Sequence, residues 1–282
     1  MESITGGKYL KPKWNYSTKD LIWRIDFSPG NIIGECRSQV NKTTYYFCLD
    51  AQSGQPVWQD YRCDESWWIG IETVYEGYLI IHGYRRPDMP EHKGIRLVSL
   101  ATGKQAWYND ELTYWFAAND SIYAYKYLFE NRVGYKLDLK TGSIIEEYIQ
   151  NLETLHELYR KVLEQKNEYD LHITTPELFD PTQNGLSLKN VIDEITGKEA
   201  LAGWIEYVVK SEMLIISYYT QNRNGLKNII AIYDQKNKIV LYKSTVADNI
   251  QAPSPDTFFI VDDYLYFIKD SNTIIAMTPW KS

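Results

Sequence analysis

The sequence of 282 residues has few of the features that mark export, membrane insertion or nucleic-acid recognition. Its three cysteines are an odd number without paired spacing, so we expect buried, reduced thiols and a cytoplasmic protein. The formal net charge of -7 excludes a general attraction to nucleic acid. No apolar run approaches the roughly 20 residues needed to cross a bilayer. The N-terminus also lacks the basic start and apolar stretch of a secretory signal.

Motifs of the common catalytic and metal sites are missing as well. The sequence has no G-x-S-x-G elbow, P-loop, G-x-G-x-x-G or H-E-x-x-H motif. Its four histidines do not show the short spacings that are typical of zinc sites. We therefore predict no metal, no cofactor and, as the first hypothesis, no catalysis.

Aromatic residues, in contrast, are abundant. They make up 15% of the chain, with 24 Tyr and 9 Trp, and large rings favour half-buried strands over helices. Apolar residues reach 44% and charged residues 24%, which indicates a packed globular protein. The composition predicts an all-β fold.

A turn motif recurs along the chain: Asp or Ser, three residues that end in Ser or Thr, then Gly. Copies lie at 50–54, 99–103, 138–142 and 193–197, and a degraded copy lies at 234–237. A type I turn followed by one left-handed residue closes a short hairpin, and Gly adopts positive φ at little cost. Trp58 and Trp107, each four positions after its glycine, are expected to pack the returning strand.

A second, tighter turn alternates with the first. Its copies centre on Gly30, Gly77, Asp120, Glu212 and Asp263, and the gap of 92 residues before Glu212 is about twice the mean period of about 46 and hides one turn. Each period holds four short strands joined by hairpins, as a propeller blade does. The sequence predicts a single domain over residues 1–282, a six-bladed β-propeller, with five or seven blades as alternatives.

Two stretches depart from the repeat. Residues 258–277 supply only three strands, so residues 11–17 are expected to form the fourth strand of the last blade and close the ring. Residues 151–187 are predicted to be an insertion in the fourth repeat, with an amphipathic helix over 151–167 and an irregular loop over 173–185.

The Asp-x-x-Thr-Gly-Lys-x-x-Trp pattern, best kept at 50–58 and 99–107, resembles the blade repeat of PQQ-like propellers. The whole chain also resembles propeller-like proteins of bacteria that carry these repeats without a cofactor. Quinoprotein dehydrogenases of that class have eight blades, a calcium site and an adjacent-cysteine disulfide, whereas this chain is about half that size and has no Cys-Cys pair. The resemblance implies a propeller without quinone, and its scaffold-type relatives imply a protein partner.

Four aromatic residues are candidate binding residues: Trp67, Trp68, Tyr114 and Trp115. They lie just before predicted innermost strands, near the loops that surround a propeller's mouth. They either pack within and between blades or provide stacking platforms for a peptide or sugar.

The loop 84–94 is longer than the hairpin norm and concentrates charge, including Arg85, Arg86 and His92. It is either a solvated loop or a site where the two guanidinium groups bind a carboxylate or phosphate.

Our first functional hypothesis is a non-enzymatic propeller that binds a protein or peptide at one mouth. The alternative is a saccharide hydrolase or lyase with carboxylates at the mouth, and a third possibility is small-ligand or sugar binding without turnover. Buried carboxylates with raised pKa values would favour the enzyme, and an aromatic mouth without them would favour binding.

Overall fold

The structure is a computed structural model. It describes residues 10–87, 89–128, 131–149, 152–170, 173–180, 186–197, 199 and 201–280. Most of them lie in antiparallel sheets. The chain divides into two compact units: unit 2 comprises residues 20–170, and unit 1 comprises residues 1–19 and 171–282. No helix in the described part of the chain is long and apolar enough to span a membrane.

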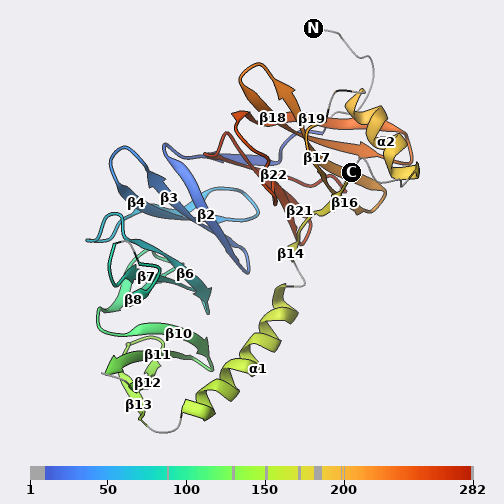
Figure 1. Cartoon of the computed structure of the whole chain (residues 1–282). Coiled ribbons are helices and arrows are strands. Elements are labelled where there is room, and N and C mark those ends of the chain that lie inside the picture. The colour runs from blue at the N-terminus through green and yellow to red at the C-terminus, as the bar shows by residue number, and fades with distance from the viewer. Residues whose placement is uncertain are drawn as a thin grey trace. The chain divides into compact units, whose positions relative to one another are not determined.

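Unit 2 contains three four-stranded sheets, in each of which consecutive strands pair in chain order (Figure 1). The first sheet comprises β2 (Leu21–Ser28), β3 (Asn31–Ser38), β4 (Thr43–Asp50) and β5 (Pro56–Tyr61). The second comprises β6 (Ile69–Tyr75), β7 (Tyr78–Tyr84), β8 (His92–Ser99) and β9 (Gln105–Asn109). The third comprises β10 (Thr113–Ala118), β11 (Ser121–Leu128), β12 (Asn131–Asp138) and β13 (Ile144–Tyr148).

The first three copies of the turn motif close hairpins between the third and fourth strands of these sheets, as predicted. Gly54, Gly103 and Gly142 adopt φ values of 70°, 65° and 69°. At the first turn, Oδ1 of Asp50 accepts hydrogen bonds from the backbone N and the Oγ of Ser53, at 2.8 and 2.6 Å. The carboxylate therefore fixes the point at which β4 ends.

The tryptophans of the repeat join each sheet of unit 2 to the next. Trp58 donates from Nε1 to the carbonyl oxygen of Leu100, at 2.7 Å, and a Cβ atom on Gly103 would lie 2.7 Å from Trp58 Cγ. Trp107 repeats this arrangement on the third sheet, with a 2.8 Å bond to the carbonyl of Leu139. The Trp and Gly positions recur together because the indole ring from one sheet occupies the space that a side chain at the turn glycine of the following sheet would fill.

Helix α1 (Leu152–Asp170) overlaps the helix predicted over 151–167 and runs three residues beyond it, and it contacts β10 and β12 of the third sheet (Figure 1). Leu155 is buried in a cluster with Phe116 and Tyr123, and a Cβ atom on Gly134 would lie 2.6 Å from Leu155 Cδ1. The glycine therefore leaves the space that the helix needs. Residue 151, where the predicted helix begins, lies outside the described residues.

Unit 1 contains two five-stranded sheets. One has the order β1 (Trp14–Ser17), β22 (Thr273–Met277), β21 (Tyr264–Lys269), β20 (Phe258–Val261) and β14 (Ile173–Thr174). The other has the order β15 (Glu177–Phe179), β16 (Ile205–Lys210), β17 (Met213–Asn222), β18 (Gly225–Asp234) and β19 (Ile239–Ile250). The N-terminal strand β1 thus pairs antiparallel with β22, the last strand of the chain.

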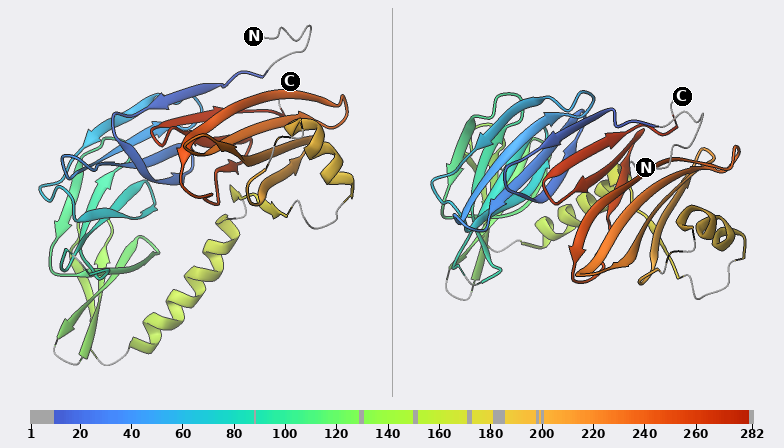
Figure 2. Two further views of the ribbon diagram at one scale, coloured as in Figure 1. Left: turned by 45° about the horizontal axis from the view of Figure 1, so that its top comes forward. Right: turned by 90° about the horizontal axis from the view of Figure 1, so that it is seen from above.

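Helix α2 (Leu186–Thr196) packs on one face of the sheet from β15 to β19 (Figure 2). Ile192 and Ile195 are buried against Ile205, Leu214 and Ile216. The opposite face of this sheet meets the sheet that contains β20 to β22, through a second apolar cluster around Phe258 and Phe267.

One expectation is not confirmed, and another is wrong. The described residues form five sheets, so the count of six blades is not confirmed. The motif copy at 193–197 is not a hairpin: Thr196 ends α2, and Gly197, at φ 65°, follows it. The same left-handed glycine terminates helices and closes hairpins, so the motif alone cannot separate the two.

The predicted irregular loop over 173–185 contains the short strands β14 and β15, which join different sheets. Strands of two and three residues are too short to produce a periodic pattern in the sequence. Residues 171–172 and 181–185 of the predicted insertion lie outside the described residues. Closure of the sheets into a ring and a single domain over 1–282 stay predictions.

Candidate functional site

The second sheet of unit 2 contains two β-bulges that lie near each other. The pairing between β6 and β7 shifts between Ile71 and Thr73, which leaves Glu72 as the extra residue. The pairing between β7 and β8 shifts at His82, opposite Gly94, whose φ is 86°. Bulges re-aim side chains away from the regular alternation of a strand, so this part of the sheet can bring polar groups together.

Glu72, His82 and His92 form a compact cluster at these bulges. Oε2 of Glu72 lies 3.1 Å from Nδ1 of His82 and 2.8 Å from Nδ1 of His92. The two imidazole rings are stacked, with centroids 3.5 Å apart and planes 8° from parallel. The side chain of His82 is 6% exposed, that of Glu72 19% and that of His92 35%, so the cluster runs from the interior to the surface.

Electrostatics favour an ionised carboxylate beside a neutral buried imidazole. Burial tends to raise the pKa of Glu72, but the contacts with His82 and His92 outweigh it and lower that pKa to about 2. Burial lowers the pKa of His82, and the neighbouring Glu72 carboxylate offsets only part of that effect. A carboxylate with a lowered pKa is poorly suited to act as a general acid near neutral pH.

Aromatic rings enclose one side of the cluster. Tyr84 lies edge-on to His82 and His92, with ring centroids 5.2 and 5.5 Å apart. Trp68 lies edge-on to Tyr84 at 6.2 Å and is 40% exposed. These contacts connect the buried histidine to an exposed indole through a continuous row of rings.

A small, open pocket lies at the exposed end of the cluster. It is lined by Arg85, Glu91, His92, Lys93, Glu111, Thr113, Lys126 and Tyr127. Each of two cations has a carboxylate partner: Arg85 Nη1 lies 2.8 Å from Glu91, and Lys126 bonds Glu111. The lining holds three cationic side chains and two carboxylates, and the exposed ring of Tyr127 stands at its edge.

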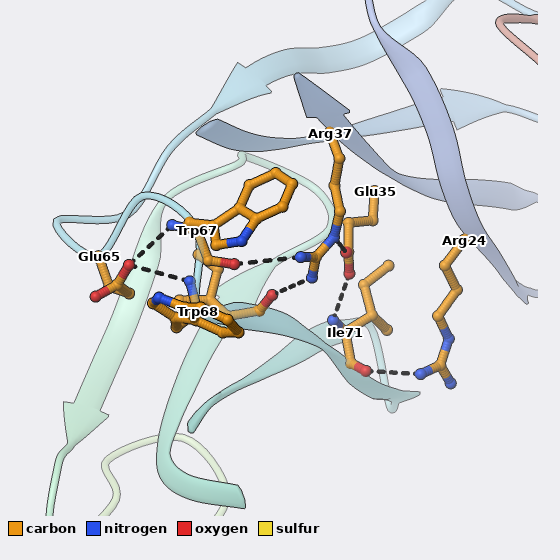
Figure 3. Close-up of polar contacts among 8 residues, drawn as sticks. Arg24, Glu35, Arg37, Glu65, Trp67, Trp68 and Ile71 are labelled. Atoms are coloured by element: carbon orange, nitrogen blue, oxygen red, sulfur yellow. Dashed lines mark hydrogen bonds and ion pairs between the residues drawn. The ribbon is translucent and has the colours of Figure 1, made fainter. Parts of the chain in front are cut away.

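A buried ion pair between Arg37 and Glu35 lies close to this cluster, next to Gly70 (Figure 3). Arg37 Nε donates to Glu35 at 2.6 Å, and Arg37 Nη1 donates to the carbonyl of Trp67 at 3.2 Å. The other oxygen of Glu35 accepts the backbone N–H of Ile71 at 2.8 Å. The pair therefore fastens β3 of the first sheet to the start of β6.

The cysteines do not contribute to this site. None of the three forms a disulfide; Cys36 and Cys48 are buried, and Cys63 is half-buried. Burial raises the pKa of Cys48 to about 12 and that of Cys63 to about 11. Both thiols are therefore protonated at neutral pH, which disfavours a role as nucleophile or metal ligand.

The structure brings together three of the residues that the sequence singled out. Arg85 and His92 line the same pocket, and Trp68 reaches His92 through the ring of Tyr84. Arg86 is exposed at the turn after Arg85.

The other three predicted residues lie elsewhere. The ring of Trp67 stacks on Arg37, with the guanidinium 5.2 Å from the ring centroid. Tyr114 packs against the apolar core between the second and third sheets. Trp115 lies beneath α1, in contact with His156 at 4.9 Å between ring centroids. All of them remain predictions as binding residues.

Glu72 and His82 were not among the predicted site residues. Short spacings within one segment mark the common metal sites, whereas these residues lie on neighbouring strands and are ten positions apart, as are His82 and His92. In the sequence, the long loop 84–94 was the only feature that pointed to a site near His92. Gly94 was the only residue that indicated irregular strand pairing there.

Comparisons with known proteins give a family match for part of the chain and solved structures that are similar at low identity. A family described as a domain of unknown function, DUF4905, matches residues 25–107, which is less than half of the chain. No curated protein matches the chain.

Several solved structures are similar to this chain at low identity. The uncharacterised protein lmo1340 from Listeria monocytogenes is 11% identical with a TM-score of 0.35, and the match covers 94% of this chain and 97% of that one. The β-propeller domain of the Trilobed protease from Pyrococcus furiosus is 7% identical with a TM-score of 0.30, covering 89% of this chain and 64% of that one. The Dos1 propeller is 10% identical with a TM-score of 0.31, covering 92% and 68%.

Proposed function

We propose that this chain is a non-enzymatic binding protein that engages a protein or peptide partner. The binding surface in this proposal is the pocket at His92 together with the exposed rings of Tyr127 and Trp68 beside it. The observation that carries the proposal is the composition of this pocket: cationic side chains outnumber carboxylates by three to two, and an exposed ring stands at its edge. Cationic groups and aromatic rings are typical anchors of polar binding surfaces.

The chemistry of the pocket favours a partner segment that carries carboxylates and an aromatic or apolar side chain. The ion pair of Arg85 with Glu91 involves one guanidinium nitrogen, Nη1, so other donors of Arg85 can reach a ligand. Lys93 lies 4.0 Å from Glu111, a weak contact that a ligand carboxylate can replace. An acidic segment would therefore meet a net positive lining without disturbing the fold.

The carboxyl groups support binding over saccharide hydrolysis. Every described Asp or Glu whose pKa is shifted has a lowered pKa: Asp50, Glu65, Glu72, Glu111, Asp138 and Asp234. A glycosidase needs one carboxyl group with a raised pKa as its general acid. No observation in the described residues favours that reaction.

The arrangement of the sheets as a propeller is part of the same proposal. We infer that the sheets are blades of a PQQ-like type of repeat in a ring, without quinone, and that the pocket lies at one mouth. Trp58 and Trp107 each pack against a glycine of the next sheet and donate a hydrogen bond to a carbonyl there, which supports a common repeat. The three cysteines, none of them in a disulfide, support a cytoplasmic location.

Selection of a random peptide library against the full chain tests the binding proposal. We expect enrichment of acidic sequences that contain an aromatic residue. Arg85→Ala should weaken binding of a selected peptide about tenfold, which corresponds to the loss of one charge-assisted hydrogen bond. Arg62→Ala is the matched control, because Arg62 is also exposed and paired with one carboxylate, Asp60, at 2.7 Å.

Two results would contradict the proposal. One is a selection that enriches no sequence class. The other is a selected peptide that binds the Arg85→Ala and Arg62→Ala variants as well as it binds the wild type.

A further inference from the structure

We propose that Glu72, His82 and His92 bind a divalent first-row transition metal ion such as Zn²⁺. These three residues each offer one ligand atom, and the atoms lie within 4.8 Å of one another. Two imidazoles and one carboxylate form a ligand set that suits such ions, whereas Mg²⁺ and Ca²⁺ prefer oxygen ligands alone. This inference does not depend on the proposed peptide partner.

Two of the three distances between ligand atoms are close to those around a tetrahedral ion, and all three atoms lie within 4.8 Å of one another. Zinc bonds of about 2.0–2.1 Å place neighbouring ligand atoms roughly 3.3 Å apart. The carboxylate oxygen of Glu72 is 3.1 Å from Nδ1 of His82 and 2.8 Å from Nδ1 of His92. Entry of an ion therefore requires these atoms to move apart by a few tenths of an ångström.

The histidines differ in how freely they can make that adjustment. His82 is held in the interior, at 5% exposure. His92 is about one-third exposed and lines the pocket, so its ring can tilt to direct Nδ1 at the ion. The pocket also gives an ion a path from solvent, and three protein ligands leave a fourth position for water.

An independent observation points to a missing ligand at His82. Both of its ring nitrogens are buried: Nδ1 faces Glu72 Oε2 at 3.1 Å without the geometry of a full hydrogen bond, and Nε2 has no hydrogen-bond partner within the described part of the chain. Buried polar groups nearly always have partners, and an unpartnered one in a native protein calls for an explanation such as an absent ion. A metal bound at Nδ1 would replace the poorly aligned contact with Glu72 by two metal–ligand bonds.

A second carboxylate, that of Glu35, lies on the same side of Gly70 as Nε2 of His82, and no hydrogen bond joins the two within the described part of the chain. A Cβ atom on Gly70 would lie 3.2 Å from His82 Nε2 and 3.3 Å from Glu35 Oε2, so the second ring nitrogen faces the side on which Glu35 lies. Glu35 is itself held by Arg37 and by the backbone of Ile71. Carboxylates behind a ligating histidine commonly orient the ring and raise its basicity.

Metal titration of the full chain, without a histidine tag and after removal of metal with EDTA, tests the proposal. We expect one equivalent of Zn²⁺ to bind by calorimetry, and one equivalent of Co²⁺ to give the visible absorption of a low-symmetry site without a thiolate band. His92→Gln should weaken binding by about 100-fold or more, because changes behind the ligands alone cost 10–100-fold.

His156→Gln is the matched control. His156 lies on α1, away from the second sheet, with Nδ1 bonded to the carbonyl of Leu152 at 2.8 Å. This variant should bind Zn²⁺ as the wild type does. The metal should also raise the melting temperature of the wild type and of His156→Gln, but not that of His92→Gln.

His92 is partly exposed, so its replacement should leave the fold intact, and the circular dichroism spectrum of the metal-free variant verifies this. Absence of stoichiometric binding to the wild type would overturn the proposal. Equal affinities of the wild type and a folded His92→Gln variant would overturn it as well, since the bound ion would then lie elsewhere.

Discussion

Gly142, in the turn between β12 and β13, allows a direct test of how the second and third sheets of unit 2 are joined. In Gly142→Ala the new methyl group would lie 2.5 Å from Cδ2 and 2.8 Å from Cε3 of Trp107. Trp107 is buried at 9% exposure and is held by its bond to the carbonyl of Leu139. The ring therefore has to move, and the bond is strained or lost.

The expected cost has two parts. An alanine at φ 69° costs about 1–2 kcal/mol from backbone sterics alone. Displacement of a packed ring adds about 1–3 kcal/mol, the usual range for overpacking in a core. We expect Gly142→Ala to lower the free energy of unfolding by about 2–5 kcal/mol.

Gly77→Ala is the matched control, because it has the same kind of backbone and no neighbour. Gly77 has φ 76°, and a Cβ atom there would meet nothing within 4 Å. It should cost only the backbone part, about 1–2 kcal/mol. Urea unfolding of both variants, followed by circular dichroism, measures the difference. Equal losses of stability would refute the role of Trp107 as the contact between the second and third sheets.

Two further predictions concern charge. Arg37→Ala should destabilise the protein by about 3–5 kcal/mol, because it leaves the carboxylate of Glu35, 1% exposed, without its cation. Arg62→Ala removes an exposed pair and should cost about 0–1 kcal/mol; similar urea midpoints for the two variants would contradict this reasoning. The hydrogen bonds from Ser53 lower the pKa of Asp50 below its ordinary 3.8, so its stabilisation is present above that pH and is lost as the pH falls. Asp50→Asn should reduce the loss of stability between about pH 5 and pH 2.5 in urea titrations, and an unchanged slope would show that the turn carboxylate does not contribute.

The proposed metal site and the proposed peptide site share His92, and separate measurements distinguish them. Arg85→Ala should weaken peptide binding and leave Zn²⁺ affinity unchanged, because Arg85 lines the pocket but is not one of the three ligands. A failed peptide selection therefore does not contradict the metal proposal, and a failed metal titration does not contradict the peptide proposal.

The turn motif is the part of the fold that the sequence determined most directly. Asp50, Gly54 and their counterparts in the next two repeats specify hairpins because the backbone conformation they need is local. The alternation of turns and Tyr-rich or Ile-rich runs then determines the strand order of the three sheets in unit 2. The prediction of a hairpin at Gly197 was wrong, because a glycine that ends a helix adopts the same left-handed conformation as one that closes a hairpin.

The number of sheets and the location of the site depended on contacts that a local pattern does not encode. The strands β14 and β15 exist because they extend edges of sheets formed by residues far away in the chain. The sequence contains Glu72, His82 and His92, but two bulges decide that their side chains meet. The sequence thus determined the hairpins and the aromatic content, whereas only the tertiary structure decided which polar groups share a buried site. The reason is that turn conformation is a property of a few consecutive residues, while strand register and bulges result from pairing between strands.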